Sequence, residues 1–152
     1  VLYELTQDRL DEPGKRSSIA IETTTLDQIF LSNVLTSRTI LKIDAEGFEF
    51  KVLIGGEKLF ETNPHLITVI EYCPQLMLQA GTSSQEFSSF CSRKQLVIFQ
   101  LIAGGNLRRL DHQGLEELTQ ELMSNPDDLL HKDLVLINKN NFDDIQRRGL
   151  IT

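Results

Sequence analysis

The sequence predicts a single α/β domain in which strands and helices alternate. Apolar runs of strand length at 39–44 and 66–71 are separated by a segment whose apolar residues have helical spacing. A strand, a helix and a strand in so short a stretch form a parallel βαβ unit. The length of 152 residues, with 40% hydrophobic and 24% charged residues, is that of one globular domain.

The first thirty residues predict a loop, a short strand and a short helix. An apolar patch at the beginning leads into a polar segment with Pro13 and Gly14, which is typical of a loop through residue 18. Residues 19–22 alternate between apolar and other side chains, as a short strand does. Thr25 and Gln28 then form a capping box that starts a helix.

The central stretch predicts a strand over Thr39–Asp44, a helix from Glu46 to Glu61, and a strand over Leu66–Glu71. Gly55–Gly56 falls inside the predicted helix, where each glycine costs up to about 1 kcal/mol relative to alanine. Close approach of the helix to the sheet would offset that cost. An early end of the helix is the alternative.

The second half predicts two further helices and a finishing strand. The predicted elements are a capping box at Ser83–Glu86 that opens a helix, a strand over Gln95–Ile102, a hairpin return through Leu107 and Leu110, a helix with Leu115, Leu118 and Leu122 on one face, and a buried strand over Leu134–Ile137. The polar residues 139–152 are expected to form a loose tail. The order predicts parallel strands with a terminal antiparallel strand.

Composition and charge exclude several classes of protein. A net charge of −7 argues against nucleic acid as a partner, and no apolar run approaches the roughly 20 residues of a membrane span. Cys73 and Cys91 lack metal-type spacing and are expected to be buried free thiols, with a disulfide as the alternative. Free thiols indicate a cytoplasmic protein. The scattered histidines, His65, His112 and His131, are expected at the surface.

Two acidic residues end the two central strands. Asp44 follows one strand and Glu71 closes the next, so the two carboxylates are expected side by side at the sheet edge where α/β proteins bind ligands. Paired carboxylates can accept a proton or hold Mg²⁺. The alternatives are a helix N-cap for Asp44 and a capping or salt-bridge role for Glu71. Gly47 is expected to serve backbone geometry, and Lys42 and Glu49 to form a structural ion pair.

These residues belong to longer segments that resemble the FkbM family of S-adenosylmethionine-dependent methyltransferases. The segments that carry the resemblance are TTTLDQIF at 23–30, ILKIDAEGFEFKVLIGGEKLF at 40–60 and LITVIEYCP at 66–74. The family pattern falls on Thr25-Leu26-Asp27, Lys42-Ile43-Asp44, Glu46-Gly47 and Glu49. The combination of these pieces is specific, whereas each piece alone is weak.

The resemblance implies part of a Rossmann-like class I methyltransferase sheet and O-methylation of a small-molecule or sugar (glycan) hydroxyl. It assigns catalysis to Asp44 and Glu71 and cofactor contacts to Asp44, Ala45 and Glu46, with Glu46 as a helix-dipole residue in the alternative. The cofactor would be S-adenosylmethionine, and Mg²⁺ could assist. The glycine-rich turn and the first strands of the family are absent from the sequence, so residues 1–152 are expected to be the C-terminal part of the domain.

Two other functions fit parts of the same sequence. A non-catalytic α/β binding module is favoured by the missing glycine-rich turn, because an adenosyl cofactor needs a close backbone approach. An exposed sheet edge left by absent strands would then favour a homo-oligomer. A metal-dependent phosphoryl-transfer enzyme could use the same two carboxylates, but no phosphate-binding glycine loop accompanies them.

Overall fold

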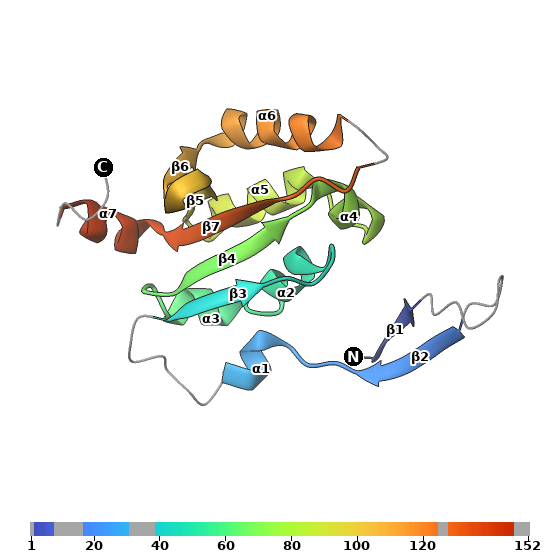
Figure 1. The fold of residues 1–152 in the computed structure, drawn as a ribbon. Coiled ribbons are helices and arrows are strands. Elements are labelled where there is room, and N and C mark those ends of the chain that lie inside the picture. Colours follow the sequence, from blue (N-terminus) through green and yellow to red (C-terminus); the bar gives the residue numbers. More distant parts are fainter. Residues whose placement is uncertain (1, 8–16, 31–38, 125–127, 148–152) are drawn as a thin grey trace.

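A computed structural model describes residues 2–7, 17–30, 39–124 and 128–147 of the chain (Figure 1). The strands are β1 (Leu2–Gln7), β2 (Ser17–Glu22), β3 (Ile40–Ile43), β4 (Ile67–Tyr72), β5 (Leu96–Leu101), β6 (Leu107–Leu110) and β7 (Lys132–Asn138). The helices are α1 (Leu26–Phe30), α2 (Glu49–Ile54), α3 (Glu57–Thr62), α4 (Pro74–Gln79), α5 (Ser84–Arg93), α6 (His112–Met123) and α7 (Lys139–Arg147), with a 3₁₀ turn at Ala103–Gly105.

Five of the described strands form one mixed sheet in the order β3-β4-β7-β5-β6. β3 and β4 pair in parallel, and α2 and α3 connect them in the chain, which confirms the predicted βαβ unit. All other pairs in this sheet are antiparallel. The predicted parallel core is therefore limited to β3 and β4. The last strand, β7, is antiparallel as predicted, but it lies between β4 and β5 and not at the end of the sheet, and its two faces are buried in the apolar clusters on the two sides of the sheet.

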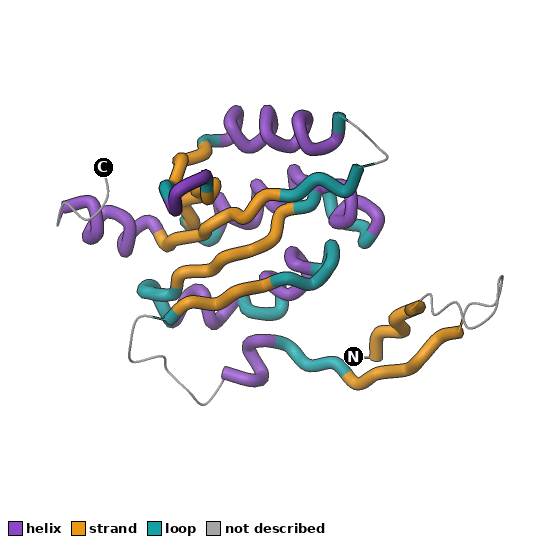
Figure 2. Tube along the Cα trace, in the orientation of Figure 1, coloured by secondary structure: helices purple, strands orange, loops and turns teal. Residues whose placement is uncertain are grey.

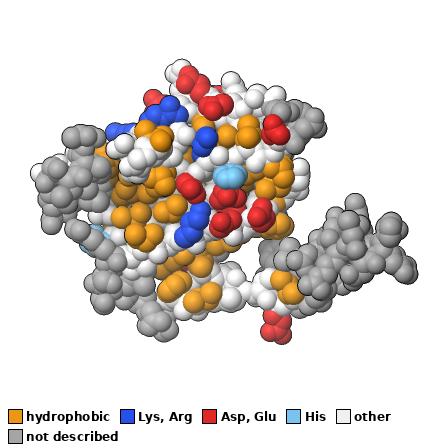
Figure 3. Space-filling model, in the orientation of Figure 1, with side chains coloured by type: hydrophobic (Ala, Val, Ile, Leu, Met, Phe, Trp, Pro, Cys, Tyr) orange, Lys and Arg blue, Asp and Glu red, His pale blue; other side chains and the backbone are white. Residues whose placement is uncertain are grey.

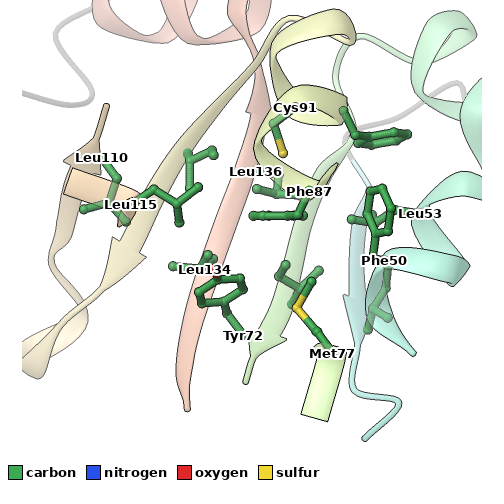
Figure 4. Packing of buried hydrophobic residues seen from close by; sticks show 14 of the residues in the cluster. Phe50, Leu53, Tyr72, Met77, Phe87, Cys91, Leu110, Leu115, Leu134 and Leu136 are labelled. Atoms are coloured by element: carbon green, nitrogen blue, oxygen red, sulfur yellow. The ribbon is translucent and has the colours of Figure 1, made fainter. Parts of the chain in front are cut away.

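Helices α2–α6 cover one face of the sheet, as Figure 2 shows, and the main core lies between these helices and the sheet. Phe50 of α2 packs edge-on against Phe87 and Phe90 of α5, with ring centroids 6.3 and 5.6 Å apart. Such aromatic pairs add about 0.5–1.5 kcal/mol beyond the area they bury. Tyr72 is fully buried in the same core (Figure 4). Its hydroxyl lies 2.7 Å from the Thr119 hydroxyl.

The opposite face of the sheet carries a smaller apolar cluster. Phe99 of β5 packs against Phe142 of α7, and Val135 and Ile137 of β7 complete the buried part of this cluster. Residues Lys139–Arg147, which the sequence analysis expected to be loose, thus form a helix with a buried aromatic anchor. The last residues of the predicted tail, 148–152, lie outside the described part.

The single helix predicted from Glu46 to Glu61 is two helices, α2 and α3, separated at Gly55–Gly56. The early helix end is therefore correct, and the glycines face α1 and not the sheet. A Cβ on Gly56 would lie 3.1 Å from the Leu26 side chain. The Asp27 carboxylate accepts the backbone N–H groups of Lys58 and Leu59, at 3.2 and 2.9 Å, and so caps α3 from α1.

Both predicted capping boxes are present. In α5, the Ser83 side chain accepts the Glu86 N–H and the Glu86 carboxylate accepts the Ser83 N–H. At α1, Thr25 and Gln28 make the equivalent pair of hydrogen bonds.

Near the beginning of the chain, β1 and β2 form an antiparallel hairpin beside the main sheet, of which only the β2 part was predicted. The loop predicted before residue 18 falls largely on residues outside the described part.

Cys73 and Cys91 are buried free thiols, as predicted. Burial raises the pKa of Cys91 to about 12, so its thiol stays protonated at neutral pH. Among the described helices, none is long and apolar enough to cross a membrane.

Candidate functional site at the carboxyl end of β3 and β4

The register of β3 and β4 brings Asp44 and Glu71 to the same edge of the sheet. Ile43 and Ile70 are direct partners in the parallel pair, and the two acidic residues follow them in sequence. The Asp44 carboxylate lies close enough to raise the pKa of Glu71. The predicted juxtaposition of these two strand ends is therefore confirmed, and Figure 3 shows acidic side chains gathered on this face beside a histidine and a basic side chain.

Glu71 is the less exposed of the two acids, with 20% of its side chain accessible. Partial burial raises its pKa, and the negative charges of Asp44 and Glu46 act in the same direction. The imidazole of His131 and the ammonium of Lys42 act in the opposite direction. The net result is a raised pKa, which makes Glu71 a better proton acceptor than an ordinary carboxylate.

Lys42 and Asp133 border the site from β3 and β7. The Lys42 Nζ lies 2.8 Å from an Asp133 Oδ1, and this hydrogen bond raises the pKa of Lys42 although partial burial lowers it. The predicted ion pair of Lys42 with Glu49 is therefore wrong. A lysine on β3 points to the opposite side of the strand from the loop that Glu49 organises, and β7 supplies the nearer carboxylate.

Glu49 holds the turn that connects β3 to α2. Its side chain is 1% exposed, and its carboxylate accepts the Ala45 N–H at 2.7 Å and the Gly47 N–H at 3.0 Å. Gly47 has φ +97°, and a Cβ there would lie 2.6 Å from the carbonyl oxygen of Leu76. Gly47 thus serves backbone geometry, as predicted, and the turn packs closely against α4.

Neither of the exposed acids of this turn, Asp44 and Glu46, caps a helix in the described part of the chain. α2 begins at Glu49, and its N-cap is Phe48, without a side-chain cap. Asp44 is therefore not an N-cap, and Glu46 lies before the first helical turn and not within it. Glu46 instead takes φ +49° and is exposed, like Asp44. For Glu71, a salt-bridge role has a concrete partner in His131, whose Nε2 lies 3.5 Å from its Oε1.

An adenosyl cofactor can bind this turn only through polar groups that are not already hydrogen-bonded within the protein. The Ala45 N–H donates to Glu49, and the Ala45 carbonyl already accepts the Phe48 N–H. The exposed carboxylates of Asp44 and Glu46 suit the cationic sulfonium and ammonium groups of S-adenosylmethionine. The charge of the site fits the cofactor, whereas the turn offers it few backbone donors.

Within the described residues, no group of three or more histidine, cysteine or acidic side chains is arranged to hold a metal ion. Lys42 also interacts electrostatically with both Asp44 and Glu71.

A cavity of about 680 Å³, lined by residues such as Leu96, Arg109 and Lys139, opens at the other edge of the sheet and does not touch the acidic pair.

Sequence reasoning missed the contributions of His131 and Asp133. The sequence predicts a surface histidine at position 131, and the His131 side chain is indeed 56% exposed, but it contacts Glu71. The available signal was the antiparallel direction predicted for the last strand. The first residues of such a strand lie at the edge where the parallel strands end, and β7 begins with Lys132 directly after His131.

The fold and the site define an α/β protein with an acidic site at the carboxyl ends of two parallel strands. The family model of the methyltransferase FkbM domain matches residues 6–91, more than half of the chain, and the chain belongs to this family. Asp44 and Glu71 fall within the matched residues, whereas His131 and Asp133 follow them. No curated protein and no solved structure matches the chain.

Proposed function

We propose that the chain acts in S-adenosylmethionine-dependent O-methylation of a small-molecule or sugar hydroxyl. The observation that carries this proposal is the juxtaposition of Asp44 and Glu71 at one sheet edge, within the residues that match the methyltransferase family. Asp44, Ala45 and Glu46 would contact the cofactor, and Asp44 and Glu71 the acceptor.

Methyl transfer to a hydroxyl is an in-line displacement at a sulfonium. The protein must align the attacking oxygen with the methyl group and accept the proton of the hydroxyl. Asp44 is exposed at the edge and can accept a hydrogen bond from the acceptor hydroxyl, which orients the oxygen. The carboxylates of Asp44 and Glu46 also offset the positive charge of the cofactor. No step of this proposal uses a metal ion.

The chain would be the C-terminal part of a Rossmann-like class I methyltransferase domain, because its sequence carries no glycine-rich turn of the kind that holds an adenosyl group. Buried free thiols at Cys73 and Cys91 favour the cytoplasm. The net charge of −7 favours a partner other than nucleic acid or an anionic membrane, and a homo-oligomer would cover apolar residues at the β3 edge, such as Ile40.

Calorimetric titration with S-adenosylmethionine tests the proposal. We expect binding by the parent chain, about tenfold weaker binding by Asp44→Asn, and unchanged binding by the control Glu61→Gln, an exposed carboxylate on α3. Transfer of a labelled methyl group to methyl glucoside should fall in Asp44→Asn and Glu71→Gln and should persist in EDTA. Binding that is equally strong in Asp44→Asn would remove the assigned site, and a loss of transfer in EDTA would restore a metal to the mechanism.

A non-catalytic binding module is the second candidate. It is favoured by the internal use of the turn's backbone N–H groups, which leaves an adenosyl cofactor few donors. A folded parent chain that shows no heat of binding with S-adenosylmethionine would support it. Light scattering on the same sample would then distinguish a self-associating module from a monomer.

A further inference from the structure

His131 stands against Glu71 at the edge of the sheet. The two side chains come from different segments, because His131 directly precedes β7 and Glu71 lies on β4. The register of these antiparallel strands pairs Glu71 with Asp133, two residues after His131. The Nε2 of His131 lies 3.5 Å from a Glu71 Oε1, and the imidazole is 56% exposed.

We infer, building on the proposed function, that His131 is the base that takes the proton of the acceptor hydroxyl and that Glu71 positions its imidazole. An imidazole that directs its Nε2 proton toward a carboxylate keeps the lone pair of Nδ1 for an incoming proton. The 3.5 Å separation suits this arrangement, since catalytic hydrogen bonds are often long before substrate binds. The exposure of His131 leaves room for a substrate beside it.

Acidic side chains gather around the pair. Asp44 and Glu46 face Glu71 from the turn after β3, and Asp133 faces it from β7. Lys42 is the opposing cation from β3, but it is hydrogen-bonded to Asp133 at 2.8 Å. The carboxylates therefore outnumber the lysine, and an imidazolium formed during the reaction would be stabilised.

A histidine is also the better base for this chemistry. An ordinary imidazole holds a proton near neutral pH, whereas an ordinary carboxylate does so only about two pH units lower. General bases are most effective when their pKa lies near the working pH. Asp44, which is exposed, is therefore better suited to accept a hydrogen bond from the hydroxyl than to remove its proton.

The acceptor oxygen forms a bond to the methyl carbon, and the bond between sulfur and that carbon breaks, with its electron pair remaining on sulfur. The sulfonium thereby becomes a neutral thioether. The hydroxyl proton moves to Nδ1 of His131, and the imidazolium later releases it to water.

Carbon NMR of glutamate side chains tests the pairing without any substrate. A protonated His131 lowers the pKa of Glu71, so His131→Gln should raise the pKa of Glu71 further. The matched control is His65→Gln, which removes another exposed histidine and should leave the Glu71 titration unchanged. An identical Glu71 titration in the parent chain and in His131→Gln would overturn the pairing.

The reactivity of the imidazole tests its role as a base. Diethyl pyrocarbonate modifies neutral imidazoles, and peptide mass spectrometry follows each histidine separately. At a mildly alkaline pH, where ordinary imidazoles are neutral, a carboxylate beside Nε2 makes Nδ1 a stronger nucleophile. We therefore expect His131 to react more slowly in Glu71→Gln than in the parent chain, with His65 and His112 unchanged as internal references. A His131 rate that does not respond to Glu71→Gln would contradict the positioning role.

A methyl-transfer assay distinguishes a failure of this inference from a failure of the proposed function. With methyl glucoside as acceptor, His131→Gln should lower kcat by about a hundredfold, within the usual contribution of a general base, and leave S-adenosylmethionine binding unchanged. Full activity in His131→Gln would overturn the inference and leave the proposed function standing. A parent chain that binds no cofactor would count against the proposed function, and the two measurements on Glu71 and His131 would still decide the pairing.

Discussion

Replacement of Glu49 by glutamine tests the account of the turn that carries the site. The parent carboxylate is 1% exposed and accepts the Ala45 N–H at 2.7 Å and the Gly47 N–H at 3.0 Å. Hydrogen bonds to charged groups contribute about 1.5–3 kcal/mol each. Glutamine keeps one acceptor oxygen but directs an amide donor at the other N–H. Loss of one bond and weakening of the second predict a decrease of about 2–4 kcal/mol in the free energy of unfolding.

Urea unfolding followed by circular dichroism measures this change. With a slope of about 2 kcal/mol per molar urea, the midpoint should fall by about 1–2 M. The control is Glu46→Gln in the same turn, where the side chain is exposed and the expected change is within about 0.5 kcal/mol. If Glu49→Gln were as stable as this control, the buried carboxylate would not be what holds the turn.

Three further substitutions test neighbouring parts of the fold, each by urea unfolding. Gly47→Ala should destabilise the chain by about 2 kcal/mol more than Gly81→Ala, because both positions have positive φ but only a Cβ at Gly47 meets backbone within 4 Å; equal losses would contradict the close packing. Asp27→Ala should cost about 0.5–2 kcal/mol through the lost cap of α3, and a loss no larger than that of an exposed control would refute the cap. Glu71→Gln should gain stability relative to the parent as the pH rises from acid to neutral. The folded state raises the Glu71 pKa, so the parent binds its proton more tightly when folded and loses stability as that proton leaves; a constant difference would contradict the raised pKa.

Features encoded by neighbouring residues could be predicted from the sequence. The capping boxes at Thr25 and Ser83 depend on side chains three residues away, and both are present in the structure. The parallel pairing of β3 and β4 follows from a strand, a short helical segment and a strand in succession. The positions of Asp44 and Glu71 at one edge required only that pairing.

Features that depend on distant segments could not be predicted in the same way. The apolar run at Leu134–Ile137 indicates a buried strand but not that its neighbours are β4 and β5. Phe142 lies in a polar segment, and its burial depends on Phe99, far away in sequence. Glu49 is an ordinary first-turn acid in the sequence, and only the packing of the turn against α4 shows that it is buried.

The residues of the family motif fall into two groups in the structure. One group holds the turn after β3 in its conformation, and the other is exposed to solvent on that turn. Gly47 and Glu49 have structural tasks that account for them, since one permits close packing and the other binds backbone N–H groups. Neither Asp44 nor Glu46 caps a helix in the described part of the chain, and both are exposed at the sheet edge. Support for chemistry therefore comes from these two carboxylates and from Glu71. The imidazole that contacts Glu71 belongs to the residue just before β7, beyond the matched residues 6–91, so the reaction centre would combine the family motif with a segment that the motif does not include.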